Sequence, residues 1–215
     1  SLSPGSPLRG LLPGGVAGSM VAGDEILRLQ KAVQAMMQEH AELTLAQDHI
    51  NTKGNGAVLH LGLSSVRRLL EATERCLLHR MIIPKAYSHA TDTPFWSLLK
   101  RLEALQQVEP WAESASRKGR SIRDTVQCIE TMKDSSGQLE RVRAWIRLCL
   151  SRKCLEDCVA DILEHPGITE DFYYQDAILA SASLSTEIVS WLRSLMYFDF
   201  KLQLTDTKGT ERAGA

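Results

Sequence analysis

The side chains best suited to metal chemistry in this sequence are two cysteines and a histidine. Cys154 and Cys158 are four residues apart and His165 follows, so the three could offer ligands to a zinc ion. A spacing of four is one turn of a helix, however, and Cys158 falls within an apolar stripe. No second Cys/His pair completes a tetrahedral set. The sequence therefore predicts no metal site and no cofactor, and we expect the cysteines to be small buried hydrophobic residues.

Other patterns that carry catalysis are absent from the sequence. It contains no Gly-x-Ser-x-Gly nucleophile elbow, no phosphate-binding loop and no dinucleotide glycine fingerprint. His60 and His79 lie in or beside apolar helical stretches, which favours hydrogen-bonded structural roles for both. We therefore expect that the chain is not an enzyme.

The charged residues are unevenly distributed, although the net charge of the 215-residue chain is only −1. Residues 117–153 contain ten Lys or Arg and four acidic residues, whereas residues 154–187 contain eight acidic residues and no Lys or Arg. The basic stretch is interpreted first as a solvated charged face and next as a protein-docking face. Acidic lipid or nucleic acid ranks last, because the chain is not basic overall and its aromatic residues fall in core stripes.

If a partner docks on the basic stretch, six residues are the expected contacts. We call them the basic rim: Arg120, Arg123, Arg141, Arg147, Arg152 and Lys153.

The helix that must position this rim is predicted around residues 140–150. Its apolar residues follow the i, i+3, i+4, i+7 spacing of a buried stripe, with a tryptophan beside them: Leu139, Val142, Trp145, Ile146 and Cys149. At about 100° per residue, Arg143 falls at the edge of the stripe, Arg147 points further toward solvent and Arg141 lies on the other flank. We expect Arg143 to be structural and paired with an acidic residue of 154–187.

Apolar periodicity and helix-breaking residues predict an all-α fold, a single globular domain of about eight helices with a short extended C-terminal segment. The helices are expected at 24–47, 59–81, 94–109, from 121, after a capping box at 135–138, at 155–163, from 169 and at 186–196. Asp24, Thr93 and Ser121 are predicted N-caps, with Pro94 at a first helical position.

The domain is expected to span 24–204, between a disordered leader at 1–23 and a disordered tail at 205–215. Residues 198–204 alternate apolar and polar side chains, but no second convincing strand is found to pair with them. We therefore expect this segment to lie against the helices.

From His60 to Leu204, the order of motifs resembles the RUN domain. The best-known signature of that family is a Gly-Arg-Gly-Arg-Ala-Trp-Leu-Arg-like helix, and this chain has Glu140-Arg-Val-Arg-Ala-Trp-Ile-Arg147. Four further motifs follow the family's order: Glu74-Arg-Cys-Leu-Leu-His79, Pro94-Phe-Trp96, Phe172-Tyr-Tyr-Gln-Asp-Ala-Ile-Leu179, and Trp191-Leu-Arg-Ser-Leu195 with Phe198-Asp-Phe-Lys-Leu-Gln-Leu204. The residues taken as the fold signature are His79, Phe95, Trp96, Arg143, Ala144, Trp145 and Tyr173.

Three positions depart from the family pattern. Both glycines of the signature helix are replaced, by Glu140 and Val142, and the glycine after the histidine is Arg80. Because these residues tolerate a helix better than glycine does, we expect no threat to the fold.

The resemblance implies an all-helical module of a larger adaptor that is not an enzyme. Such modules are associated with small GTPases of the Rab and Rap groups and with motor-linked or endolysosomal trafficking, so we expect a small GTPase or a motor or tether protein as partner. No apolar run reaches the ~18–20 residues of a membrane span. We expect a cytoplasmic module recruited to endosomal or vesicle membranes.

Three other functions are kept as alternatives. The helix at 24–47 could make the chain a homodimer, an arginine could be inserted into a nucleotide site to activate a GTPase, and the basic stretch 117–153 could bind anionic lipid.

Overall fold

The computed structural model describes residues 15–49, 58–60, 62–83, 93–108, 117–132 and 137–204, without the side chains of 15–20, 46–49, 107–108 and 117–121. Eight α-helices occur within these residues: α1 Gly15–His49, α2 Ser64–Leu78, α3 Pro94–Val108, α4 Arg117–Glu130, α5 Gln138–Ser151, α6 Leu155–Leu163, α7 Pro166–Phe172 and α8 Ala182–Ser194. Short 3₁₀ turns, η2 Ile178–Ala180 and η3 Leu195–Tyr197, flank α8, and the strands are β1 Val58–His60 and β2 Asp199–Lys201. The predicted all-α fold of about eight helices is confirmed.

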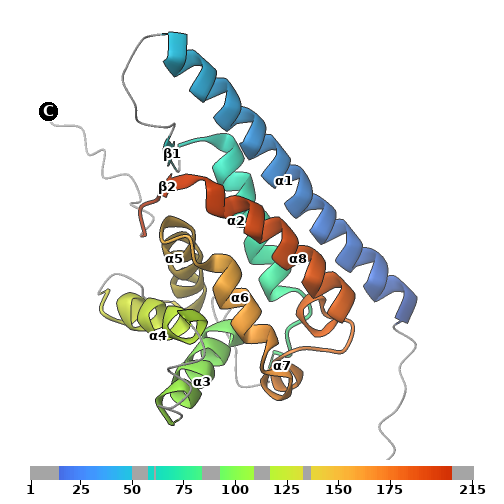
Figure 1. Ribbon diagram of the computed structural model, residues 1–215. Helices are drawn as coiled ribbons and strands as arrows, with labels where there is room; N and C mark the ends of the chain where they lie inside the picture. Colours follow the sequence, from blue (N-terminus) through green and yellow to red (C-terminus); the bar gives the residue numbers. More distant parts are fainter. Residues whose placement is uncertain are drawn as a thin grey trace, which may run out of the picture.

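The longest helix, α1, runs along one side of the molecule against α2 and α8 (Figure 1). Its periodic residues Ile26, Leu29, Val33 and Met36 are at most 3% exposed, which confirms core packing. The helix begins at Gly15 rather than at the predicted Asp24, so placing 15–23 in a disordered leader was wrong. No proline interrupts 15–23 and Ala22 continues the buried face, so the helix needs no cap at Asp24. Residues 1–14 and 205–215 lie outside the described residues.

The remaining helices lie on the far side of α2 and α8 from α1 (Figure 1). Helix α5 packs against α2, α3, α4, α6 and β2. Its predicted stripe is confirmed, because Val142, Trp145, Ile146 and Cys149 are at most 1% exposed. The fold therefore packs the signature helix against elements from several parts of the chain.

Local signals set some helix starts and not others. The side-chain oxygen of Thr93 accepts the backbone N–H of Phe95 at 3.4 Å, and Pro94 opens α3, as predicted. The capping prediction at Ser121 was wrong, because α4 already begins at Arg117. The residue before α5 is Gly137, so no side chain caps this helix there. Ser135, the first residue of the predicted capping box, lies outside the described residues.

The C-terminal segment is held by a strand that the sequence analysis missed. Strands β1 and β2 pair in parallel, with Val58 opposite Asp199 and His60 opposite Lys201. The predicted second helix started at Leu59, whereas α2 starts at Ser64. Three residues are too short for a period-2 pattern to be recognised, which explains the error.

Arg80 adopts a left-handed backbone conformation, with φ 56°. This position follows α2 and corresponds to the glycine of the family pattern. Glycine is favoured there because a Cβ is strained at positive φ, so the expectation that helix tolerance explains the replacement was wrong. The side chain of Arg80 makes contacts in return: an ion pair with Asp176 at 2.9 Å and a stacking contact 5.2 Å from the ring centre of Tyr174.

Candidate interaction surface

The aromatic signature residues are components of the core. Trp145 is fully buried, its indole N–H donates to the hydroxyl of Thr125 at 3.0 Å, and its ring meets the edge of Phe95 at 5.6 Å between centroids. Ala144 and Trp96 are 2% and 4% exposed. These residues are therefore placed to hold α3, α4 and α5 together.

His79 and Tyr173 join the end of α2 to the segment around η2. The hydroxyl of Tyr173 donates to the carbonyl oxygen of Leu77 at 2.6 Å, and the Nδ1 atom of His79 accepts the backbone N–H of Ile178 at 3.3 Å. Burial raises the pKa of Tyr173, and burial together with Arg80 lowers the pKa of His79. Both side chains are buried, so their contacts here are structural.

Arg143 pairs with Glu74 of α2, not with an acidic residue of 154–187 as predicted. Its Nε atom donates to Glu74 Oε2 at 2.8 Å and its Nη2 atom to Glu74 Oε1 at 3.2 Å, and Nη1 reaches Glu140 at 2.9 Å. The hydrogen bonds that Arg143 donates to Glu74 raise the pKa of Arg143 further above its ordinary value. A helix projection gives the direction of a side chain, but it does not identify the helix that lies in that direction.

Arg147 is buried, which contradicts the expectation that it points toward solvent. It is 7% exposed, and its Nη1 atom donates to the carbonyl oxygen of Leu204 at 3.3 Å. The segment that follows β2 supplies this carbonyl, and β2 itself packs on α5. The predicted contact residue therefore anchors the end of the described chain.

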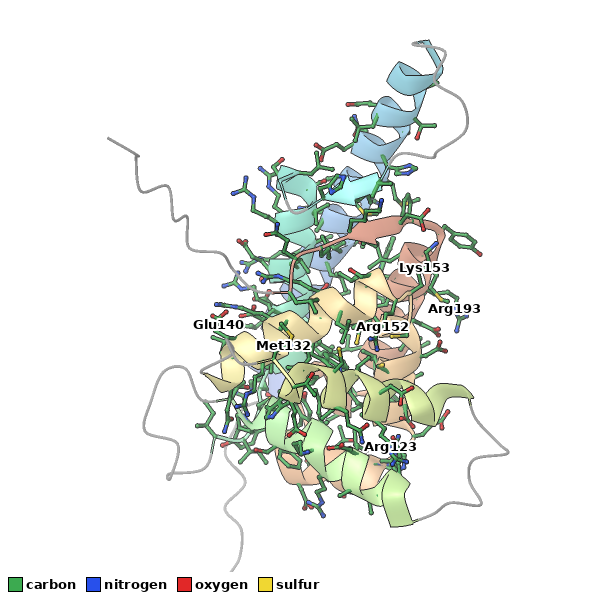
Figure 2. The ribbon with its side chains drawn as sticks, turned by 90° about the vertical axis from the view of Figure 1, so that its left-hand side faces the viewer. Arg123, Met132, Glu140, Arg152, Lys153 and Arg193 are labelled. Carbon is green, nitrogen blue, oxygen red and sulfur yellow. The ribbon has the colours of Figure 1, made fainter. Side chains whose placement is uncertain are left out.

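The other members of the basic rim do not form one continuous surface. Figure 2 shows Arg152 and Lys153 together at the end of α5 and Arg123 apart from them on α4. Lys153 forms an ion pair with Asp199 at 2.7 Å, and the guanidinium carbon of Arg141 lies 5.9 Å from the ring centre of Trp96. Arg123 and Arg152 are exposed, and the Arg152 Nη2 atom is 3.6 Å from Cys128 Sγ. The side chain of Arg120 lies outside the described residues.

Several residues of the acidic stretch 154–187 are paired with cations in the structure. Acidic residues of 154–187 are paired with basic residues from several elements: Glu156 with Arg193 at 2.9 Å, Asp171 with Arg101 at 2.6 Å, and Asp176 with Arg80 at 2.9 Å. The local excess of acids is thus partly balanced by cations distant in sequence.

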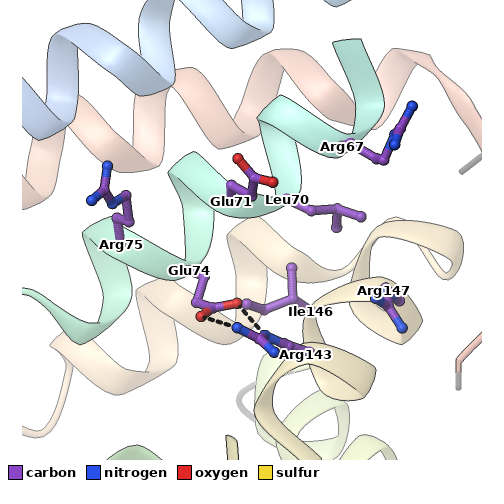
Figure 3. A pocket seen from close by; sticks show the side chains of 8 residues that line it. All are labelled: Arg67, Leu70, Glu71, Glu74, Arg75, Arg143, Ile146 and Arg147. Atoms are coloured by element: carbon purple, nitrogen blue, oxygen red, sulfur yellow. Dashed lines mark hydrogen bonds and ion pairs between the residues drawn. The ribbon is translucent and has the colours of Figure 1, made fainter. Parts of the chain in front are cut away.

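A groove of about 620 Å³ lies between α2 and α5 (Figure 3). Helix α2 contributes Arg67, Leu70, Glu71, Glu74 and Arg75, and α5 contributes Arg143, Ile146 and Arg147. The Arg143–Glu74 ion pair crosses the groove from one helix to the other. The sequence analysis did not identify this site, although the four-residue spacing of Arg67, Glu71 and Arg75 marks a charged helix face.

One cluster of potential metal ligands occurs in the described part of the chain: Cys149, Cys154 and Cys158. His165, considered in the sequence analysis, is not part of it. None of the helices, as far as the structure describes them, combines the length and apolarity needed to cross a membrane.

The comparisons with known proteins agree with the motif order. The family model described as RUN domain matches residues 68–206, which is more than half of the chain. No curated protein matches the sequence significantly. The family match begins within α2 and includes every helix from α3 to α8. The signature helix, the basic rim and every groove residue except Arg67 lie inside it. RUN domains are interaction modules associated with small GTPases, and the chain belongs to the RUN domain family.

Proposed function

We propose that this chain is a non-catalytic docking module for a small GTPase of the Rab or Rap type, or for a motor or tether protein, and that the partner contacts the groove between α2 and α5. The proposal also places the chain in an adaptor that is recruited to endosomal or vesicle membranes. Family membership over residues 68–206 carries the class of function. The groove between α2 and α5 is the surface that we assign to the partner.

The composition of the groove fits a protein interface. The half-buried Leu70 provides accessible apolar surface, whereas Ile146 lines the groove but is only 1% exposed. The exposed Arg67, Glu71 and Arg75 provide a charged border. Specific interfaces combine an apolar centre with a polar periphery, and arginine is enriched in them. Charges of both signs at the border favour one orientation of the partner.

The Arg143–Glu74 ion pair gives this surface a fixed shape. It joins the two walls of the groove by two hydrogen bonds. A surface that is already ordered loses less conformational entropy when a partner binds. Arg143 thus supports the binding surface without needing to contact the partner itself.

The direct test is affinity capture of the chain by a panel of Rab and Rap GTPases loaded with GTP or GDP. The double variant Arg67→Glu/Arg75→Glu is expected to lose at least tenfold in affinity for a captured GTPase, with an unchanged helical circular dichroism spectrum. Arg123→Glu/Arg152→Glu is the matched control, because it makes the same change in net charge outside the groove.

The possible outcomes distinguish an error in the proposed partner from an error in the proposed binding surface. If no GTPase is captured in either nucleotide state, the GTPase arm of the proposal fails. If only the control variant loses binding, the contact surface is the basic rim and the groove assignment is wrong. Equal losses in both variants that disappear at high salt would indicate general electrostatic attraction.

The structure disfavours two of the alternatives. The α1 stripe expected to drive self-association is covered by α2 and α8 of the same chain. Arg143 is held by Glu74 and Arg147 is buried, so neither is presented for insertion into a nucleotide site. Assays of GTP hydrolysis and liposome capture on the same proteins test the activating and lipid-binding alternatives.

A further inference from the structure

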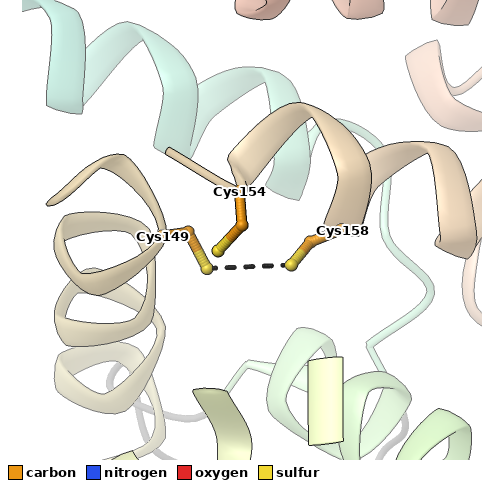
Figure 4. Close-up of side chains that lie close together, drawn as sticks. All are labelled: Cys149, Cys154 and Cys158. Atoms are coloured by element: carbon orange, nitrogen blue, oxygen red, sulfur yellow. Dashed lines mark hydrogen bonds between the residues drawn. The ribbon is translucent and has the colours of Figure 1, made fainter. Parts of the chain in front are cut away.

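Three cysteine side chains converge where α5 ends and α6 begins (Figure 4). The sulfur atoms of Cys149, Cys154 and Cys158 all lie within 4.8 Å of one another, and those of Cys149 and Cys158 are 3.9 Å apart. None of the three cysteines is in a disulfide. Cys149 and Cys158 are completely buried, whereas Cys154 is half-buried and gives the cluster a side nearer to solvent.

The backbone of the turn builds this arrangement. Lys153 takes a left-handed conformation with φ 56°, which ends α5 and starts α6 two residues later. The backbone N–H of Cys154 donates to the carbonyl oxygen of Cys149, and that of Cys158 to the carbonyl oxygen of Cys154, both at 2.9 Å. The three sulfurs are therefore brought together by hydrogen-bonded main chain.

We propose that Cys149, Cys154 and Cys158 form a three-thiolate site for one thiophilic d¹⁰ metal ion, Zn²⁺ or Cu⁺. Soft thiolate ligands select these ions over magnesium and calcium. Sulfurs bound at ~2.3 Å to a tetrahedral zinc are about 3.8 Å apart, close to the 3.9 Å between Cys149 and Cys158. On binding, each thiol releases its proton to solvent as its sulfur bonds to the metal, so no oxidant or reductant is required.

The charges around the site suit a metal–thiolate centre. Three thiolates with one Zn²⁺ carry a net charge of −1. The turn next to them holds the exposed Arg152, and Lys153, which is also paired with Asp199. A zinc ion would take its fourth ligand, a water or an external thiol, from the half-buried Cys154 side. Copper(I) needs only the three sulfurs.

Metal binding explains the cluster better than a disulfide does. A disulfide uses two sulfurs, whereas three converge here. His165 is not a candidate fourth ligand, because it is not part of this cluster.

The test is titration of the reduced, metal-free chain with Co²⁺ as a spectroscopic probe, followed by displacement with Zn²⁺ and a separate Cu⁺ titration against a chromophoric chelator. Thiolate-to-cobalt charge-transfer absorption that saturates at one ion per chain supports the site. Cys154→Ser should weaken binding at least tenfold. Cys128→Ser changes a half-buried cysteine outside the cluster and should bind as the wild type does.

A second readout keeps the test decisive if Cys154→Ser does not fold. In the wild-type chain, bound metal should protect the half-buried Cys154 from alkylation but leave the half-buried Cys128 as reactive as before. The proposal is overturned if neither Zn²⁺ nor Cu⁺ binds at one ion per chain, if folded Cys154→Ser binds as tightly as wild type, or if two of the three cysteines form a disulfide in the native chain under reducing conditions.

Discussion

Arg143 and Glu74 are 69 residues apart in sequence, and their side chains meet in a two-pronged ion pair, at 2.8 Å and 3.2 Å. Glu140, one turn before Arg143 on the same helix, accepts from the third guanidinium nitrogen at 2.9 Å. The signature arginine therefore joins α5 to α2, and it also fixes the width of the proposed docking groove.

Glu74→Gln should destabilise the chain more than Glu140→Gln. The Glu74 side chain is 19% exposed and bonds Arg143 across two helices, whereas the Glu140 side chain is 44% exposed and belongs to the same helix. Double-mutant cycles with Arg143→Lys should give a coupling free energy of about 1–2 kcal/mol for Glu74 and below about 0.5 kcal/mol for Glu140. Urea unfolding measures both. Equal coupling energies would contradict the assignment of Glu74 as the main partner.

Sequence patterns were sufficient where neighbours in sequence decide the structure. The stripe of α5, the Thr93–Pro94 start of α3 and the span of α6 follow from local periodicity and capping, and all agree with the structure. Arg143 was recognised as structural for the same reason. Its partner was not, because Glu74 is brought to it only by the packing of α2 on α5.

Several other errors concern features that no local sequence pattern indicates. Arg147 is buried because the segment after β2 lies across it, and β2 is positioned by pairing with β1 from the opposite end of the chain. Cys149 was not grouped with Cys154 and Cys158, because the turn between the helices depends on a positive φ at Lys153 that no local pattern indicates. The groove was missed for a similar reason, because its walls belong to α2 and α5 and only their packing brings them together.

Tyr173→Phe should cost about 1–3 kcal/mol of unfolding free energy, because it leaves the buried carbonyl oxygen of Leu77 without its 2.6 Å hydrogen bond. The neighbouring Tyr174 provides a matched control. Its side chain is 50% exposed, so Tyr174→Phe should change stability by less than about 0.5 kcal/mol. Denaturant unfolding of the two variants gives the comparison, and a Tyr173→Phe protein as stable as wild type would exclude a structural role for this hydroxyl.

Arg80→Gly should be more stable than Arg80→Ala, by about 1 kcal/mol. Both variants lose the ion pair with Asp176 and the contact with Tyr174, but only glycine relieves the strain of a Cβ at φ 56°. The comparison of the two variants cancels the side-chain loss and isolates the backbone effect. Thermal and urea unfolding should rank the variants in the same order; a more stable alanine variant would show that this position is not left-handed in solution.

Stability should fall as the pH is lowered from 7 toward 5, with His79 as one cause. Burial and the charge of Arg80 lower its pKa in the folded chain, and they outweigh the opposing effects of Asp176 and Glu25. Near pH 6.5, His79 therefore binds more protons in the unfolded chain than in the folded one. The stability that neutral His79 contributes is complete above that pH, and it is lost as the pH falls from the unfolded pKa toward the lower folded pKa.

His79→Asn isolates this effect, because an amide oxygen can replace Nδ1 as the acceptor of the Ile178 N–H. The variant should lose less stability than wild type between pH 7 and pH 5, whatever its stability at pH 7. Parallel curves of unfolding free energy against pH for the two proteins would rule out His79 as a source of the acid sensitivity.

Cys76 should report whether α1 stays docked on α2. Its sulfur lies 3.5 Å from the carbonyl oxygen of Glu25 on α1, and burial, with a smaller contribution from the charge of Glu25, raises the pKa of the Cys76 thiol to about 12. At pH 8, only about one such thiol in ten thousand is ionised, and the thiolate is the form that reacts. Iodoacetamide should therefore label native Cys76 far more slowly than the half-buried Cys128, and both at similar rates in urea.

The labelling also tests how α1 is held, since this helix lies outside the family match. Leu29→Ala removes a completely buried side chain of α1 and should cost about 2–5 kcal/mol. If α1 can detach while the rest of the chain stays folded, the variant should label Cys76 faster and leave the rate at Cys128 unchanged. An equal increase at both cysteines would instead mean that α1 unfolds together with the helices of the family domain. Rapid labelling of Cys76 in the wild-type chain would contradict the docked position of α1 altogether.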